Sequence, residues 1–232
     1  MKRVLWPAAV AVAALGAPLL APTLSRCDAR PQPKLEKGKL VVASRDLSDP
    51  NFSETVILLL AYGPNGTMGV ILNRPSNVKL TTVLPDIKKL RGRPDVVYLG
   101  GPVLTDHVLL LIRANKAPRD SLLVFDDVYA SSSLTTLSHA LERPTSKDLF
   151  RAYAGHAGWA PGQLEAEIDR GDWYVTGAEA DTVFTKTPKQ LWQTLMPRVE
   201  GDWVRRDDLG APTDVTSAGI GFDSVLLMSK VE

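Results

Sequence analysis

The chain has 232 residues, of which 44% are hydrophobic and 23% charged, a composition typical of a globular protein with length for one sizeable core. Its 27 basic and 26 acidic residues give a net charge of +1, so it lacks the basic surplus of proteins that bind phosphate backbones. One cysteine excludes an internal disulfide framework, and three scattered histidines argue against a zinc site. We therefore expect no nucleic-acid partner, no metal and no cofactor.

Residues 1–29 have the layout of a secretory signal peptide. Lys2 and Arg3 precede an uncharged apolar run over residues 4–24, and a polar stretch with small residues follows. The run is also long enough, at about 1.5 Å per residue, to span a bilayer as an uncleaved anchor. We expect an exported or membrane-tethered protein of the periplasm or cell envelope, which meets the membrane only through this segment if it stays uncleaved.

Besides retention as an anchor, this segment has two alternative fates. Three prolines weaken it as a permanent helix, which favours cleavage, with Ala29 as the candidate last residue. Cys27 is an alternative site of lipid attachment, although Arg26 stands where lipoprotein signals prefer a small residue. Residues 30–37, rich in proline and charge, then form a linker to the folded domain.

Runs of β-branched and leucine residues between turn signals predict a sheet. The predicted strands are 40–44, 55–62, 67–73, 96–101, 107–113, 121–131, 149–159 and 172–176. Asn65-Gly66, between two of these runs, predicts a hairpin in which both turn residues have positive φ. The glycines around this turn do not form a phosphate-binding loop, because no Gly-Lys-Ser/Thr and no helix follow them.

Three helices are predicted among the strands. Ser133 can cap a helix over 133–142, and Gly171 closes a helix over 162–170. Thr187 caps the last helix, with Gln190 completing a capping box. Beyond residue 198 the pattern dissolves, so residues 199–232 read as a C-terminal extension with at most one short strand at 225–228.

The elements together predict one compact domain over residues 38–198. Hairpins and strand–helix–strand units are mixed along it, so the class is α/β, on the border with α+β, with a mixed and mostly antiparallel sheet flanked by short helices.

Three segments together resemble the YqgE/AlgH family of bacterial proteins: "DPNFSETVILLLAYGPNGTMGVILNRPS" at 49–76, "VYLGGPV" at 97–103 and "AGHAGWAPGQLEAEI" at 154–168. The resemblance spans nearly all of residues 38–198. It implies a single domain with a mixed sheet flanked by helices, and a poorly defined biochemistry. One branch of the family is labelled a transcriptional regulator, without a recognisable DNA-binding module.

Two features depart from the family pattern. Members usually begin at the first strand and look cytoplasmic, whereas this chain has the export signal and the C-terminal extension. The family turn usually has an aromatic residue where this chain has His156. An exported domain does not meet the chromosome, so we expect no DNA-binding role.

The stretch "GHAGWAPGQLEAEI", residues 155–168, predicts a strand-to-helix corner that lines a ligand or partner site. The glycines allow the bend, Trp159 supplies a wall, and the start of the helix offers free N–H groups to an anion. "NRP" and "GGP", at other strand ends, are candidates for a second wall. The candidate binding residues are Asn73, Arg74, Gly100, Gly101, Pro102, Gly155, His156, Gly158, Trp159, Gly162, Gln163 and Glu165.

We assign no catalytic residue from the sequence. The Gly-x-Ser-x-Gly elbow and the zinc-protease, dinucleotide and Walker motifs are all absent. We therefore expect a non-enzymatic binding or regulatory module that takes a protein partner or a small anionic ligand. The alternative is a hydrolase of unknown substrate that uses His156 with Glu165 or a loop serine.

Overall fold

The structure, a computed structural model, describes residues 34–141 and 149–208, with the side chains of 202–208 left out. The predicted signal segment, the first part of the linker and the predicted strand at 225–228 lie outside these residues. Within them, no helix is long and apolar enough to cross a membrane.

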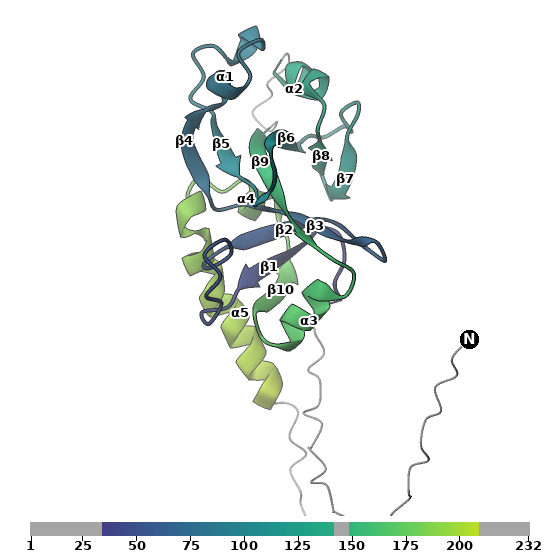
Figure 1. Cartoon of the computed structure of the whole chain (residues 1–232), viewed down its shortest axis with the longest axis vertical. Helices are drawn as coiled ribbons and strands as arrows, with labels where there is room; N and C mark the ends of the chain where they lie inside the picture. Colours follow the sequence, from purple (N-terminus) through teal and green to yellow (C-terminus); the bar gives the residue numbers. More distant parts are fainter. Residues whose placement is uncertain (1–33, 142–148, 209–232) are drawn as a thin grey trace, which may run out of the picture.

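The described residues form an α+β domain around a curled, mostly antiparallel sheet (Figure 1), as predicted. The strands pair in the order β10-β1-β2-β3-β9-β6-β8-β7, and β4 joins through β5, which lies parallel to β9; all other pairs are antiparallel. The strands are β1 (Lys39–Ala43), β2 (Val56–Gly63), β3 (Gly66–Ile71), β4 (Pro75–Lys79), β5 (Val96–Leu99), β6 (Val103–Arg113), β7 (Leu122–Phe125), β8 (Val128–Ser131), β9 (Leu149–Trp159) and β10 (Trp173–Gly177).

The helices are short except for the last, which packs along β1 and β10. They are α1 (Leu80–Val83), η1 (Lys88–Leu90), α2 (Leu134–Ala140), α3 (Gln163–Asp169), α4 (Ala180–Val183), η2 (Pro188–Gln190) and α5 (Leu191–Asp208). The sequence prediction missed β4, α1, η1 and α4, all of five residues or fewer, because so short a run carries no readable period.

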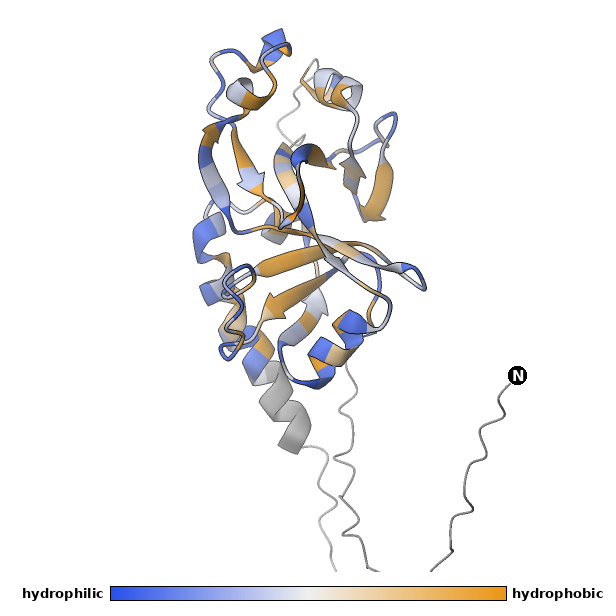
Figure 2. Cartoon of the chain, viewed as in Figure 1, coloured by the Kyte–Doolittle hydropathy of each residue, from blue (hydrophilic) through white to orange (hydrophobic). Residues whose placement is uncertain are grey.

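Strand β9 joins the two halves of the sheet. It pairs with β3 near its end and with β5 and β6 nearer its start. Because successive side chains of a strand point to opposite faces, β9 serves two cores. Tyr153, Ala157 and Trp159 belong to the larger core, which includes the apolar strands β1 and β2 (Figure 2), whereas Ala152 belongs to a smaller one with Leu110.

Three local predictions were wrong. The hairpin between β2 and β3 forms, but of its two turn residues only Gly66 has positive φ. Ser133 and Thr187 precede their helices, yet neither side chain makes a capping hydrogen bond. The predicted strand over 121–131 is two strands, because Asp126, with φ 41°, turns the chain between β7 and β8.

The predicted C-terminal boundary was also wrong. Residues 199–208, assigned from the sequence to the extension, continue helix α5. Val199, only 5% exposed, packs into the larger core. This packing stabilises a helix whose sequence has a proline at 197 and a weak apolar stripe.

Candidate functional site

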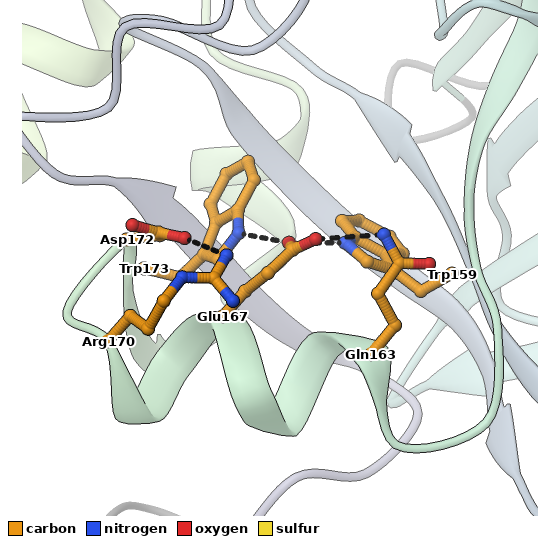
Figure 3. Close-up of polar contacts among 6 residues, drawn as sticks. All are labelled: Trp159, Gln163, Glu167, Arg170, Asp172 and Trp173. Atoms are coloured by element: carbon orange, nitrogen blue, oxygen red, sulfur yellow. Dashed lines mark hydrogen bonds and ion pairs between the residues drawn. The ribbon is translucent and has the colours of Figure 1, made fainter.

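The carboxylate of Glu167 is the centre of a hydrogen-bond network on α3 (Figure 3). Its Oε2 accepts the indole Nε1–H of Trp159 and that of Trp173, each at 2.8 Å. Its Oε1 accepts the Nε2–H of Gln163 at 2.9 Å. Three neutral donors therefore hold the negative charge of Glu167 in one orientation.

Phe52 packs over the two tryptophans. Its ring centroid lies 6.3 Å from that of Trp159, nearly parallel, and 5.9 Å from that of Trp173, edge to face. The two indoles meet edge to face at 6.0 Å. Trp159 and Trp173 are 6% and 1% exposed, whereas Phe52 is half-buried, so Phe52 is the aromatic ring of this cluster that solvent reaches most easily.

The loop that carries Phe52 is fixed by two residues that the sequence singled out. Arg74 donates to the carbonyl oxygens of Asn51 at 2.6 Å, of Ser53 at 3.2 Å and of Pro50 at 3.3 Å. Burial lowers the pKa of Arg74 from its ordinary value.

Asn73, which is buried, accepts the amide N–H of Val56 and donates to the carbonyl of Glu54. These two bonds tie the end of β3 to the start of β2. Together with the bonds of Arg74, they hold residues 50–56 in one conformation. Asn73 and Arg74 therefore fix the conformation of the loop that carries Phe52.

A cleft of about 730 Å³ lies between this loop and α3. Three carboxylates, Asp49, Glu167 and Asp172, line it against one guanidinium, Arg170, which is paired with Asp172 at 2.6 Å. The cleft is therefore acidic. Its lining consists of Leu47, Ser48, Asp49, Pro50, Asn51, Phe52, Gly158, Trp159, Gln163, Glu167, Arg170, Asp172 and Trp173.

The start of α3 has no side-chain cap, and its first side chain turns back to the residue after β9. Gly162 precedes the helix with φ 76°, and Gln163 accepts the amide N–H of Ala160 through its Oε1 at 3.0 Å. Glu165 points to the neighbouring hairpin, where its carboxylate accepts the hydroxyl of Tyr62 at 2.7 Å and so raises the pKa of Tyr62. The helix has only seven residues, so its dipole offers little to an anion.

The "GGP" residues, 100–102, were predicted to form a second wall of the site but do not line the cleft. Gly100 and Gly101 cross β9 at Gly155, where the backbones are so close that a Cβ on Gly101 would lie 2.2 Å from the carbonyl carbon of His156. A Cβ on Gly155, which has φ 71°, would lie 2.5 Å from the carbonyl oxygen of Gly101. This crossing requires glycine, and none of its residues, nor Pro102, lines the cleft.

His156 lies on the other face of β9 from Trp159, three residues away. Burial, with a smaller contribution from the nearby His107, lowers the pKa of His156. Within residues 34–141 and 149–208, no hydrogen bond joins His156 to Glu165 or to a serine. The described residues thus do not assemble the triad that the hydrolase alternative requires.

Sequence reasoning missed the residues around which the cleft is built. Glu167, Phe52 and Trp173 are not among the candidate binding residues that the sequence predicts. The available signal was the pair of tryptophans flanking a helix with an inward glutamate, since a buried indole N–H needs an acceptor.

Comparison with known proteins places this architecture in a family. A family model described as AlgH-like matches residues 40–204. A UPF0301 protein of Streptomyces coelicolor is 38% identical over 168 residues, which cover 71% of this chain and 87% of that protein. A UPF0301 protein of Mycobacterium tuberculosis is 35% identical over 175 residues, 71% of this chain and 83% of its own length.

Two solved structures have the same fold. A crystal structure of a protein from Corynebacterium diphtheriae aligns with a TM-score of 0.63 and 27% identity, over 72% of this chain and 88% of that one. The solution structure of the AlgH protein from Pseudomonas aeruginosa aligns with a TM-score of 0.56 and 26% identity, over 80% of this chain and 95% of that one. The chain therefore belongs to the AlgH-like family, as its three motif segments predicted.

Proposed function

We propose that this member of an uncharacterised family is a non-enzymatic binding module, and that the cleft between residues 47–52 and α3 takes a ligand with a positive charge. The observation that carries the proposal is the lining of the cleft, with three carboxylates against one guanidinium. An amine or guanidine group gains from such a lining, whereas an anion would be repelled. The small anionic ligand expected from the sequence does not suit this cleft.

The shape of the cleft supports binding because its walls are fixed before a ligand arrives. Glu167 is held by three donors, and the opposite loop is held by Arg74 through three carbonyl oxygens. A preformed site loses little conformational entropy on binding. Phe52, half-buried at the cleft, offers an apolar surface beside the carboxylates.

The ligand class that matches is a small molecule or peptide side chain with an apolar body and an amine or guanidine group. The apolar part would contact Phe52, and the charge would lie near Asp49 and Asp172. The hydrolase alternative gains no support, because His156 lies on the other face of β9 and does not line the cleft.

The test uses the indole N–H signals of Trp159 and Trp173 in the full-length chain, followed by ¹H–¹⁵N NMR. Tyramine, a cation with an aromatic body, is titrated in parallel with the anion hydroxyphenylpropanoate. We expect tyramine to shift both indole signals and hydroxyphenylpropanoate to leave them unchanged. Trp192, whose indole donates to the carbonyl of Ala43, is the internal reference.

A charge-matched pair of variants completes the test. Asp49→Asn removes a carboxylate of the cleft, and we expect it to weaken tyramine binding several-fold. Asp169→Asn removes an exposed carboxylate at the end of α3, outside the cleft, and we expect no effect. Equal shifts with both compounds, or no shift with either, would contradict the proposal.

We also propose that the domain acts outside the cytoplasm. The support is the order of Lys2, Arg3, an uncharged apolar run and a polar stretch with small residues in the first 29 positions. A fusion of residues 1–40 to a reporter that is active only outside the cytoplasm should give a signal, and a silent fusion of normal abundance would refute this location.

A further inference from the structure

We propose a second binding site, an oxyanion site for phosphate groups, in a cleft between β4 and the turn that leads from η1 into β5. The cleft has a volume of about 520 Å³ and lies at the far side of β5 from β9. Its lining contains Lys79 and Arg93 and no carboxylate. Its charge is thus opposite to that of the cleft at α3.

A bulge in β4 opens this cleft. Pro75 pairs with Tyr98 and Lys79 with Val96, so three residues of β4 lie opposite one residue of β5. The extra residues arch away from β5, and the hydroxyl of Ser76 accepts the amide N–H of Val78 at 3.0 Å within the arch. Bulges of this kind redirect side chains next to binding sites.

Arg93 is held in place for a ligand. Its Nε donates to Asp95 at 2.6 Å, and its guanidinium lies over the ring of Phe150, 5.5 Å from the centroid. Within the described residues its two Nη groups have no protein acceptor. A guanidinium fixed through Nε, with both Nη groups available, suits two oxygens of one oxyanion.

Lys79 supplies the second charge. It is exposed and makes no ion pair in the described part of the chain. The hydroxyls of Ser76 and Thr81 and the amide of Asn77 line the same cleft and can donate to further oxygens. The lysine and arginine in one carboxylate-free cleft thus match a phosphate monoester or diester.

The surrounding surface adds to this attraction. Between Lys79 and Arg93 the chain also carries Lys88, Lys89 and Arg91, against one acidic residue, Asp86. The whole chain has a net charge of only +1, so the segment that connects the two cations of the cleft is richer in positive charge than the chain as a whole. The phosphate could belong to a soluble molecule or to a lipid headgroup, and the chemistry of recognition is the same.

The test compares two sources of phosphate with the full-length chain. Inorganic phosphate is titrated while the backbone amides are followed by ¹H–¹⁵N NMR, and co-sedimentation is measured with phosphatidylcholine vesicles with and without phosphatidylglycerol. We expect phosphate to shift the amides of Gly92 and Arg93, or phosphatidylglycerol to cause sedimentation if the natural phosphate is a headgroup.

Variants decide between a site and general electrostatic attraction. Lys79→Gln and Lys79→Gln/Arg93→Gln should weaken binding by about tenfold and about a hundredfold, respectively. Lys116→Gln/Lys186→Gln removes two exposed charges elsewhere and should retain full binding. Arg93 contacts Asp95 and Phe150, so its replacement can destabilise the fold. If the double variant does not fold, Lys79→Gln by itself is the test. Absence of binding to both phosphate sources, or equal loss in the control, would overturn the proposal.

Discussion

Replacing Glu167 by glutamine tests whether its carboxylate holds the tryptophan pair together. The side chain keeps its shape, and the remaining oxygen can still accept both indole N–H groups. The new amide NH₂, however, faces the Nε2–H of Gln163, so that one donor meets another. Gln163 cannot turn its amide over without losing the bond from Ala160 to its Oε1.

The expected cost follows from these contacts. One hydrogen bond is lost, and the two indole bonds lose the contribution of a charged acceptor, which together amounts to about 2 kcal/mol of unfolding free energy. Glu167→Ala leaves both indole N–H groups, on side chains that are 6% and 1% exposed, without their acceptor. At roughly 1–3 kcal/mol for each buried donor, we expect a loss of about 3–5 kcal/mol.

Urea unfolding followed by circular dichroism measures these changes, with thermal melts as a second readout. For a domain of this size, about 1 kcal/mol shifts the Tm by roughly 2–4 °C. Glu165→Gln, on the same helix, is the matched control, because among the described residues the side chain of Glu165 makes a single hydrogen bond, the exposed one to Tyr62. We expect that variant to lose no more than about 1 kcal/mol.

Two results would refute this reasoning. The first is a Glu167→Gln protein within about 0.5 kcal/mol of the wild type, since the acceptor would then be dispensable. The second is an equal loss in Glu165→Gln, since the effect would then belong to helix α3 in general. A Glu167→Gln protein more stable than the wild type would identify the carboxylate as a group kept for binding at the expense of stability.

Three further outcomes are expected. Trp159→Ala should lose about 3–5 kcal/mol in urea unfolding, because Trp159 is only 6% exposed and contacts two other aromatic rings. A loss below about 1 kcal/mol would show that the cluster is not a packed core. Gly155→Ala should lose about 3 kcal/mol or more of unfolding free energy, because Gly155 has φ 71° and the new Cβ would lie 2.5 Å from a carbonyl oxygen. Gly171→Ala, where φ is 87° but no atom is within 4 Å of the new Cβ, should lose about 1 kcal/mol. His156 has a lowered pKa in the folded protein, so the unfolded chain binds the proton first, and stability should fall as the pH drops below about 6.5. Thermal melts of His156→Asn should show a smaller loss over this pH range, and an unchanged pH profile would contradict the assignment.

The predicted strands were recovered where one segment carried enough local information. The run over 149–159 is β9 with the same ends, and the run over 55–62 is β2 shifted by one residue. Both are long and apolar, and their residues 56–60 and 157 and 159 are buried as the pattern requires. Both signals are visible in the sequence because side-chain direction depends only on the backbone of the strand itself. An unbroken apolar run fits a strand covered on both faces, and alternation fits a strand with one buried face.

Predictions that depended on a distant partner failed or were incomplete. The caps expected at Ser133 and Thr187 did not form, and the helix over 199–208 exists because Val199 packs into the core. "GGP" was expected beside the helix corner, but it crosses β9 at Gly155. For Val199 and for "GGP" the deciding contact joins residues far apart in the chain, which no local pattern records. The caps failed for a local reason, because the hydroxyls of Ser133 and Thr187 contact those of Thr135 and Thr185, two residues away.

The sequence by itself determined the family, the sheet class and the glycine-bounded corner before α3, because these depend on motif order, on residue alternation and on backbone freedom. Only the tertiary structure decided what the corner does. It brought Trp159, Trp173 and Phe52 to one carboxylate, and it surrounded them with Asp49 and Asp172. The charge of a cleft is the sum over side chains from separate elements, which no single segment records. The start of α3 alone predicted an anion site, but the loop after β1 packs against α3 and the cleft between them is acidic.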